Sequence, residues 1–258
     1  MRFNIPALPP IQLQSIFQLI LTLAASLLTL RFSAGIVAWK TANNLEKPNY
    51  TVVKSLPASP PTYRGRRNVV EVRKYEPYLI AETTVDESSM RKAGGAGFGK
   101  CAGYIFGKNR PRTKGGGEGE KMAMTAPVRS VGDVAGEKMA MTAPVRSSGK
   151  MSGKKTKVSF VIGSKYDLKS APKPIDESVR VRTVKEHYLA ATSFSGPPPS
   201  DERIVEEREA IVRTLREEGI RVKDGEETMV YGYHDPVITP DFLRRNEVAV
   251  MVDGSSLN

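Results

Sequence analysis

The sequence predicts an α+β domain that is preceded by an apolar helix outside the domain. Short runs of β-favouring residues recur from about residue 50 onwards, as expected for antiparallel strands. A segment with helical periodicity near residue 205 and a weaker one near residue 95 supply two helices. A long apolar run occupies the start of the chain instead. Together these patterns indicate one domain over residues 50–253, with a short tail at 254–258.

The N-terminal segment, residues 1–40, differs in composition from the rest of the chain. No charged residue occurs between Arg2 and Arg31, and residues 11–30 are mostly Leu, Ile, Ala and Phe. A helix of about 20 such residues just crosses a bilayer, so we expect a transmembrane helix that anchors the protein to a membrane. One alternative is a targeting peptide that is removed on secretion or on import into a chloroplast, since Ser33-Ala34-Gly35 suits processing. The other is a buried core helix, against which the preceding prolines and the following polar linker argue.

Strand patterns follow this segment. Residues 41–67 contain four prolines and predict a linker that includes a short strand at Tyr50–Val53. Two β-favouring runs follow around Val70 and Ile80, and Glu76-Pro77 between them predicts a hairpin. Further strands are predicted at residues 158–162, 179–184, 188–194, 228–233 and 247–252.

Two helices are expected within the domain. The first, over residues 86–106, has a helical pattern at both ends, but four glycines between residues 94 and 99 predict a weak middle. The second begins after Pro197, where Ser200 or Asp201 can cap its first amides, and it ends at Gly219. Its apolar residues recur at helical spacing over about three turns, which indicates a helix that lies on a sheet.

The chain carries 39 basic and 28 acidic residues, a formal charge of +11 that would suit nucleic acid, an anionic membrane surface or an acidic ligand. The glycine-rich stretch 85–157 holds 15 of the basic and six of the acidic residues, which indicates a solvated rim. Aromatic residues are not interleaved with the basic ones, as base stacking would require, so no nucleic-acid partner is expected. The single cysteine, Cys101, excludes an internal disulfide and a cysteine-based metal site.

The stretch Gly94–Lys100 reads GGAGFGK and fits the pattern of a phosphate-binding loop. Such a loop requires a preceding β-strand and a Ser or Thr directly after the lysine. Here Cys101 follows the lysine, and no strand pattern precedes the glycines. We therefore expect a glycine-softened helix or turn instead of a nucleotide site.

The segment GEKMAMTAPVRS occurs twice, at residues 119–130 and 136–147. Methionines alternate with smaller residues in each copy, which predicts a strand with a methionine face that ends at an edge or bulge where the proline lies. Methionine is polarizable and adaptable, so such a face could line a pocket for a flat apolar ligand. The alternative is that these methionines are ordinary core residues, and the pattern alone does not decide between the two.

This repeat and several further segments, in the same order, resemble the SOUL haem-binding protein family over about residues 50–253. The other segments are 71–75 (EVRKY), 102–109 (AGYIFGKN), 158–161 (VSFV), 194–196 (FSG) and 243–248 (LRRNEV). The resemblance implies a distorted antiparallel β-barrel with two pseudo-symmetric halves, flanked by two helices. It also implies reversible, non-catalytic binding of haem or a related tetrapyrrole, for buffering, transport or sensing, through apolar contacts and propionate-binding cations.

The resemblance places the haem near the first helix. It maps onto residues of that helix, with two methionines of the repeat as further lining: Met90, Arg91, Phe98, Ala102, Tyr104, Met122 and Met139. His234 stands where relatives have the tyrosine of a Tyr-Asn-Pro-Pro turn, and we include it as a candidate contact. The axial iron ligand is not identified, because a lone histidine such as His187 or His234 more often has a structural role.

Two other classes of function stay open. An enzyme acting on tetrapyrroles would need a nucleophile, a base and an orienting acid together, and no pattern places Cys101 or a serine near either histidine. A module for another small amphipathic ligand would bind that compound tightly and leave the absorption spectrum of added haem unchanged.

Overall fold

The computed structural model describes residues 10–58, 69–87, 89–112, 119–133, 155–223 and 227–257. Its main feature is a nine-stranded antiparallel sheet with the order β1-β2-β9-β11-β10-β5-β6-β3-β8. The strands are β1 (Tyr50–Pro57), β2 (Val69–Tyr75), β3 (Tyr78–Val85), β5 (Val128–Asp133), β6 (Thr156–Ile162), β8 (Val179–Val184), β9 (His187–Ser195), β10 (Glu227–Gly232) and β11 (Arg245–Val252). A second, two-stranded sheet pairs β4 (Asn109–Arg110) with β7 (Lys173–Pro174).

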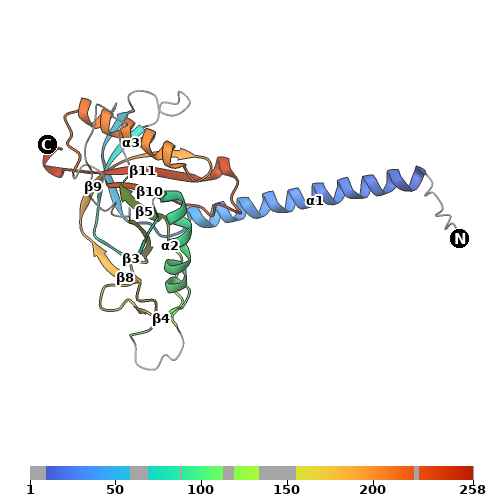
Figure 1. The fold of residues 1–258 in the computed structure, drawn as a ribbon, viewed down its shortest axis with the longest axis horizontal. Coiled ribbons are helices and arrows are strands. Elements are labelled where there is room, and N and C mark those ends of the chain that lie inside the picture. The colour runs from blue at the N-terminus through green and yellow to red at the C-terminus, as the bar shows by residue number, and fades with distance from the viewer. Residues whose placement is uncertain are drawn as a thin grey trace, which may run out of the picture.

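The sheet curls into a half-barrel, and two helices pack against it (Figure 1). The predicted α+β class with antiparallel strands is confirmed. The predicted distorted β-barrel is a half-barrel in the described strands, because β1 and β8 form the two ends of the strand order. The predicted pseudo-symmetry between two halves of the barrel stays a prediction.

Helix α3 (Asp201–Glu217) confirms the second helix expected from the sequence. The Ser200 side chain accepts a hydrogen bond from the Arg203 amide and caps the helix, as Ser, Thr, Asp and Asn do at this position. Gly219 has a φ of 68° just after the last turn, a conformation that glycine adopts without strain. The apolar stripe of α3, which includes Ile211 and Leu215, belongs to a buried cluster with residues of β2, β9 and β11.

Helix α2 (Met90–Ile105) runs without a break through the glycines for which the sequence predicts a weak middle. Ser89 caps its first turn by accepting a hydrogen bond from the Lys92 amide. The physical reason for a glycine in the middle is close packing, because a Cβ on Gly97 would lie 2.5 Å from the Cβ of Val158 on β6. The GGAGFGK stretch is therefore helical, and it is not a phosphate-binding loop.

Two glycine substitutions on α2 test this account of the helix. Gly97→Ala is expected to lower the free energy of unfolding by about 1–3 kcal/mol, because the added methyl group overpacks the contact with Val158. Gly99→Ala is expected to raise it by up to about 1 kcal/mol, because that Cβ meets no described atom within 4 Å and alanine favours a helix. Urea unfolding of the full chain in non-ionic detergent measures both. Equal effects of the two substitutions would contradict the proposed close contact.

The repeated segment has a different structure from the one expected. In the first copy, residues 121–124 are not a strand, and the strand β5 begins only at Val128, after Pro127. The Met122 amide donates to the carbonyl of Ile105, and the Thr125 hydroxyl donates to the carbonyl of Val161. The prediction of a methionine strand is therefore wrong for this copy, because its polar groups bond to α2 and β6 and Pro127 has no N–H to donate. The second copy, 136–147, lies outside the described residues.

Helix α1 (Pro10–Asn43) extends away from the sheet as a long rod (Figure 1). It is the one helix among the described residues that is long and apolar enough to cross a membrane. Its C-terminal part contacts the segment between β10 and β11. The ring of Phe32 stacks on that of Phe242 with 6.3 Å between centroids, and Gly35 lies against Pro240.

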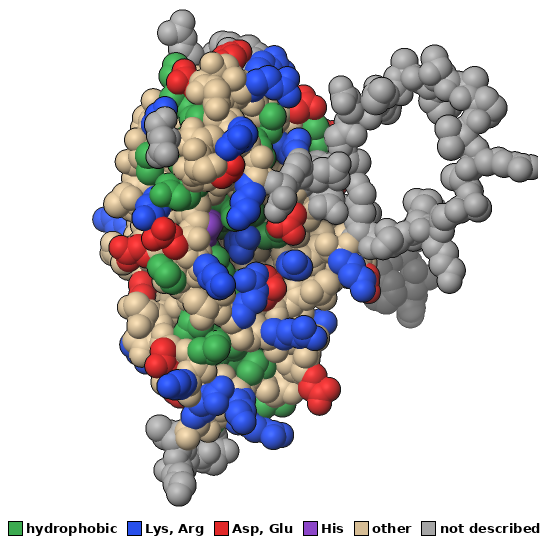
Figure 2. Space-filling view, turned by 90° about the vertical axis from the view of Figure 1, so that its left-hand side faces the viewer, with side chains coloured by type: hydrophobic (Ala, Val, Ile, Leu, Met, Phe, Trp, Pro, Cys, Tyr) green, Lys and Arg blue, Asp and Glu red, His purple; other side chains and the backbone are tan. Residues whose placement is uncertain are grey.

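Figure 2 shows the face of the protein turned away from α1. Lys and Arg side chains gather at its centre and lower end, with Asp and Glu side chains among them. The positive net charge is therefore spread over a surface of mixed sign on this face.

Candidate ligand pocket between helix α2 and the sheet

A pocket of about 490 Å³ lies between α2, the sheet and the turn that follows β10. Its walls are predominantly apolar. The residues that line it are Met90, Arg91, Gly94, Gly95, Phe98, Val128, Ser130, Pro198, Pro199, Ile204, Val230, Gly232, His234, Asp235, Pro236, Val237, Arg244 and Asn246.

The register of the sheet explains why these residues meet. Val128 and Ser130 on β5 lie opposite Gly232 and Val230 on β10, and residues directly opposite each other point to the same face of a sheet. This is the face on which α2 and α3 pack, because Val158 of the same row contacts Gly97 of α2. The pocket floor is therefore made by alternating residues of two neighbouring strands.

Helix α2 forms the wall opposite this floor. Met90, Gly94 and Phe98 recur every fourth residue and therefore lie on one side of the helix. The absence of side chains at Gly94 and Gly95 leaves space between the helix and the strands. A Cβ on Gly94 would come within 3.5 Å of the Ser130 hydroxyl, whereas one on Gly95 would meet no described atom within 4 Å. The glycines thus create room that larger residues would fill.

Two arginines lie at the rim of the pocket. Arg244 is held in place, since its Nε donates to the Thr239 carbonyl at 2.6 Å and its Nη1 pairs with Asp241 at 2.8 Å. Arg91 is exposed and forms no ion pair with any residue that the structure describes. An acidic group of a bound molecule would therefore find one fixed and one freely oriented guanidinium at this rim.

His234 accepts one hydrogen bond in this structure and has one N–H that no described group uses. Its Nδ1 accepts a hydrogen bond from the Arg245 amide at 3.0 Å, so the neutral ring carries its proton on Nε2. The pKa of His234 is lowered by burial and by the nearby charges of Lys47, Arg245 and Arg244, which keeps the ring neutral. Nε2 is buried without a partner among the described residues. Because a metal ion binds the unprotonated nitrogen, this arrangement favours a donor role over metal ligation.

The other predicted site residues lie elsewhere or outside the described residues. Ala102, Tyr104 and Met122 belong to a buried cluster behind α2 and do not line the pocket. The Tyr104 hydroxyl donates to the Pro172 carbonyl at 2.9 Å, and burial raises its pKa to about 12. Met139 lies in a segment that the structure does not describe. The structure therefore brings Met90, Arg91, Phe98 and His234 together at one pocket.

The remaining candidate ligand atoms lie away from the pocket. Cys101 is buried, and burial raises the pKa of its thiol to about 12, which keeps it protonated. The ring of His187 stacks on Tyr75 at 5.3 Å, and its Nδ1 contacts the Lys185 carbonyl at 2.7 Å. Within the described residues, no group of three His, Cys, Asp or Glu side chains is arranged to hold a metal ion.

Several residues of the pocket were missed by sequence reasoning. Pro198 and Pro199 follow Pro197 just before the predicted second helix, and Val230 lies in a predicted strand, so the sequence indicates no pocket role for any of them. Arg244 belongs to the LRRNEV segment but carried no predicted role. One signal was present in the repeat, because Val128 and Ser130 alternate around Arg129 as strand residues do.

Comparison with known proteins identifies a family. The chain matches the family described as "SOUL heme-binding protein" over residues 45–251. No curated protein sequence matches it. Among solved structures, it is similar to the C-terminal domain of EcmrR, with 8% identity, a TM-score of 0.42 and coverage of 72% of this chain and 98% of that one. It is also similar to a hydrolase from Listeria innocua, with 10% identity, a TM-score of 0.43 and coverage of 80% and 92%.

Proposed function

Because the chain belongs to the SOUL heme-binding protein family, we propose that it binds haem or a related tetrapyrrole in the pocket between α2 and the sheet. The observation that carries this proposal is the pocket itself. Its volume of about 490 Å³ falls within the range of about 300–1,000 Å³ that is usual for small-molecule sites. We propose binding without catalysis, for buffering, transport or sensing of the ligand.

The chemistry of the lining suits a flat apolar ring with acidic substituents. Met90, Phe98 and Val230 would contact the faces of the ring, because burial of apolar surface is the main driving force for such binding. Arg91 and Arg244 would pair with the propionates, since guanidinium groups form strong, charge-assisted hydrogen bonds with carboxylates. When bound, haem would supply an iron centre, whose axial ligands in proteins are usually His, Met, Cys or Tyr.

His234 would contribute a hydrogen bond to this ligand. In the structure its Nε2 carries the proton, because Nδ1 already accepts from the Arg245 amide. The ring therefore offers N–H and no free lone pair to the pocket ligand. We propose that haem is held chiefly by apolar contacts and propionate pairing, without a histidine ligand to the iron.

We further propose that α1 anchors the protein and that the pocket lies at the membrane surface. Arg31 ends the uncharged part of α1, and Gly35, which contacts Pro240, follows four residues later. Four residues rise about 6 Å along a helix axis. The polar headgroup layer is about 5–8 Å thick on each side of a bilayer. The segment around Pro240 would therefore lie within this layer.

The exposed side chains of this segment support that placement. Val237 and Phe242 are 72% and 64% exposed, and Ile238 beside them is 48% exposed. Large apolar residues of this kind are costly in water and are favourable at a membrane interface. Val237 and Pro236 also belong to the rim of the pocket. A tetrapyrrole dissolved in the bilayer would thus reach the pocket without crossing water.

A titration of haem tests the proposed function. The full chain in phosphatidylcholine vesicles is expected to shift the Soret band of added haem, relative to vesicles alone. Arg91→Gln is expected to weaken binding about threefold, because an exposed ion pair contributes up to about 1 kcal/mol. The same variant should leave binding of haem dimethyl ester unchanged, since the ester has no carboxylates.

Lys92→Gln is the matched control, because Lys92 is the next exposed cation on α2 and does not line the pocket. It is expected to bind haem like the wild type. The proposal is wrong if haem shows no spectral change while another apolar compound binds tightly.

Flotation tests whether α1 anchors the protein. The full chain is expected to float with vesicles that have been washed with carbonate. Recovery of a shortened chain in the soluble fraction of its cell would instead support a targeting peptide that is removed.

A further inference from the structure

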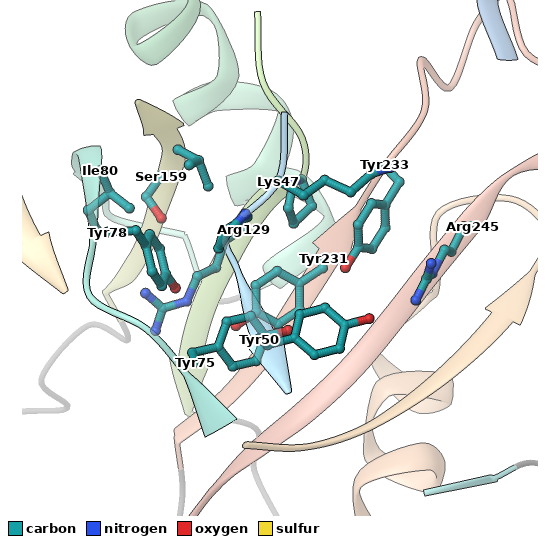
Figure 3. A pocket seen from close by; sticks show the side chains of 13 residues that line it. Lys47, Tyr50, Tyr75, Tyr78, Ile80, Arg129, Ser159, Tyr231, Tyr233 and Arg245 are labelled. Carbon is teal, nitrogen blue, oxygen red and sulfur yellow. The ribbon is translucent and has the colours of Figure 1, made fainter. Parts of the chain in front are cut away.

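A second, smaller cavity lies on the opposite face of the sheet. Arg129 stands between Val128 and Ser130 on β5, so its side chain points away from the ligand pocket that those two residues line. The cavity has a volume of about 30 Å³. Figure 3 shows Arg129 reaching towards Tyr78, with the rings of Tyr50, Tyr75 and Tyr231 gathered near it.

A row of polar residues crosses the sheet at this level. Each member lies directly opposite the next in the register of five neighbouring strands, so their side chains share one face. The row runs from β9 to β6 through Ser193, Glu247, Tyr231, Arg129 and Ser159. A polar row inside a curled sheet must satisfy its hydrogen bonds within the protein or with a bound molecule.

One end of this row is fully paired. Glu247 accepts hydrogen bonds from Arg73 at 3.0 Å, Arg245 at 2.6 Å and Tyr233 at 2.7 Å. Arg73 also pairs with Glu71 at 2.7 Å. Two arginines thus face two carboxylates, and this part of the interior is electrically balanced.

The positive charge of Arg129 is not balanced by a carboxylate in this way. It forms no ion pair with any described residue. The nearby carboxylates have other partners, since Glu82 pairs with Arg182 at 2.7 Å and Glu227 lies 4.0 Å from Lys157. The guanidinium stays charged: burial acts to lower the pKa of Arg129, but tyrosines and glutamates around it act to raise it, and the net shift is upward.

Several hydrogen-bond donors at Arg129 and beside it have no acceptor among the described residues. Nε and Nη1 of Arg129 are buried without a hydrogen-bond partner among the described residues, although part of the side chain is exposed. Among the described residues, its Nη2 has a hydrogen bond only to the sulfur of Met229, at 3.2 Å, and sulfur is a weak acceptor. The Ser159 hydroxyl, directly opposite on β6, is likewise buried with no partner in the described part of the chain. A buried cation that has no counter-charge is strongly unfavourable.

We propose that this cavity is a binding site for a small monoanion, with Arg129 as the charged partner and Ser159 as a hydrogen-bond donor. Its small volume of about 30 Å³ suits a small anion such as a chloride ion or a carboxylate of one carbon. Both ligands share a single negative charge and several acceptor sites, which match the unused donors. The bound anion neutralises Arg129 and completes the polar row of the sheet.

The site is independent of the tetrapyrrole pocket, because it lies on the other face of β5. It also gives a role to part of the repeated sequence. In the first copy of PVRS, Val128 and Ser130 line the ligand pocket, whereas Arg129 between them faces the anion cavity. Strand β5 would therefore contribute to both sites, because its successive side chains point to opposite faces of the sheet.

Thermal unfolding of the full chain in non-ionic detergent tests the proposal at constant ionic strength. Replacing gluconate, a much bulkier anion, by formate or chloride is expected to raise Tm by about 3 °C or more at tenfold excess over Kd. The more effective of the two anions identifies the preferred ligand. Arg129→Met is expected to abolish the difference between anions, and Arg182→Met, which removes an exposed arginine of β8, is expected to preserve it.

Ser159→Ala provides a second variant in case Arg129→Met does not fold. The substitution removes a hydroxyl that bonds to no described group, and it is expected to weaken the response to formate at least twofold. The proposal is overturned if Tm of the wild type is the same in formate, chloride and gluconate, which would indicate water alone in the cavity. It is also overturned if Arg129→Met responds to the anions as the wild type does.

Discussion

Replacement of Glu247 by alanine is expected to lower the free energy of unfolding by about 3–5 kcal/mol, which is enough to unfold many domains of this size. Glu247 is fully buried and accepts hydrogen bonds from two arginines, Arg73 and Arg245, and from Tyr233. Without the carboxylate, Arg73 keeps its charge in the interior and loses its main partner. Urea unfolding of the full chain in detergent measures the loss.

Glu82→Ala is the control for this prediction. Glu82 also pairs with an arginine from a neighbouring strand, at 2.7 Å, but its partner Arg182 is 44% exposed. A solvated arginine regains water when its partner is removed, so the expected loss is at most about 1 kcal/mol. A similar loss for both variants would show that burial of the Glu247 network contributes no special stability.

The pH dependence of stability distinguishes the charge of Glu247 from its packing. Burial acts to raise its pKa, but the hydrogen bond and charge of Arg73, the charge of Arg245 and the hydrogen bond of Tyr233 lower it from 4.5 to about 2. The folded state therefore binds this proton more weakly than the unfolded state does. The contribution of the ionised carboxylate is complete above about pH 5 and is lost as the pH falls towards 2. The wild type should lose more stability over this range than Glu247→Gln.

Elements whose signal is local could be predicted from the sequence. Helix α3 was placed correctly because its apolar spacing, the Ser200 cap and Gly219 are all read within one segment. The strands β6 and β8 were likewise found from continuous β-favouring runs. The strand prediction for the first copy of the repeat is wrong because alternation of residue size also fits an extended segment outside a sheet. The hydrogen bonds of this copy to Ile105 and Val161 depend on tertiary contacts, which no local pattern indicates.

The site could be predicted only in part for the same reason. Met90 and Phe98 share a helix with a known period, so their position on one face follows from the sequence once the helix is placed. Val230 and Pro199 enter the pocket only through the order of strands in the sheet. Arg73 and Glu247 are 174 residues apart, and no local pattern indicates that they pair.

Gly94→Leu is expected to weaken haem binding tenfold or more while leaving the domain folded. Gly94 is on the pocket side of α2, and a Cβ there would make an ordinary contact, at 3.5 Å, with the Ser130 hydroxyl on the pocket floor. The rest of a leucine side chain must then occupy the space between α2 and β5 that we assign to the tetrapyrrole. The loss of one ring contact of about 1.4 kcal/mol already lowers affinity tenfold. Titration by the Soret band measures the change.

Gly99→Leu separates occupation of the pocket from a change in the helix. A Cβ on Gly99 meets no described atom within 4 Å, and Gly99 does not line the pocket. Both substitutions replace glycine by a better helix former, so both should raise or preserve the stability of α2. Only Gly94→Leu is expected to lose affinity for haem. If both variants bind haem like the wild type, the ligand lies outside this pocket. The buried cluster on the other side of α2 then becomes the alternative location, because it contains Ala102 and Tyr104 of α2 and also Met122.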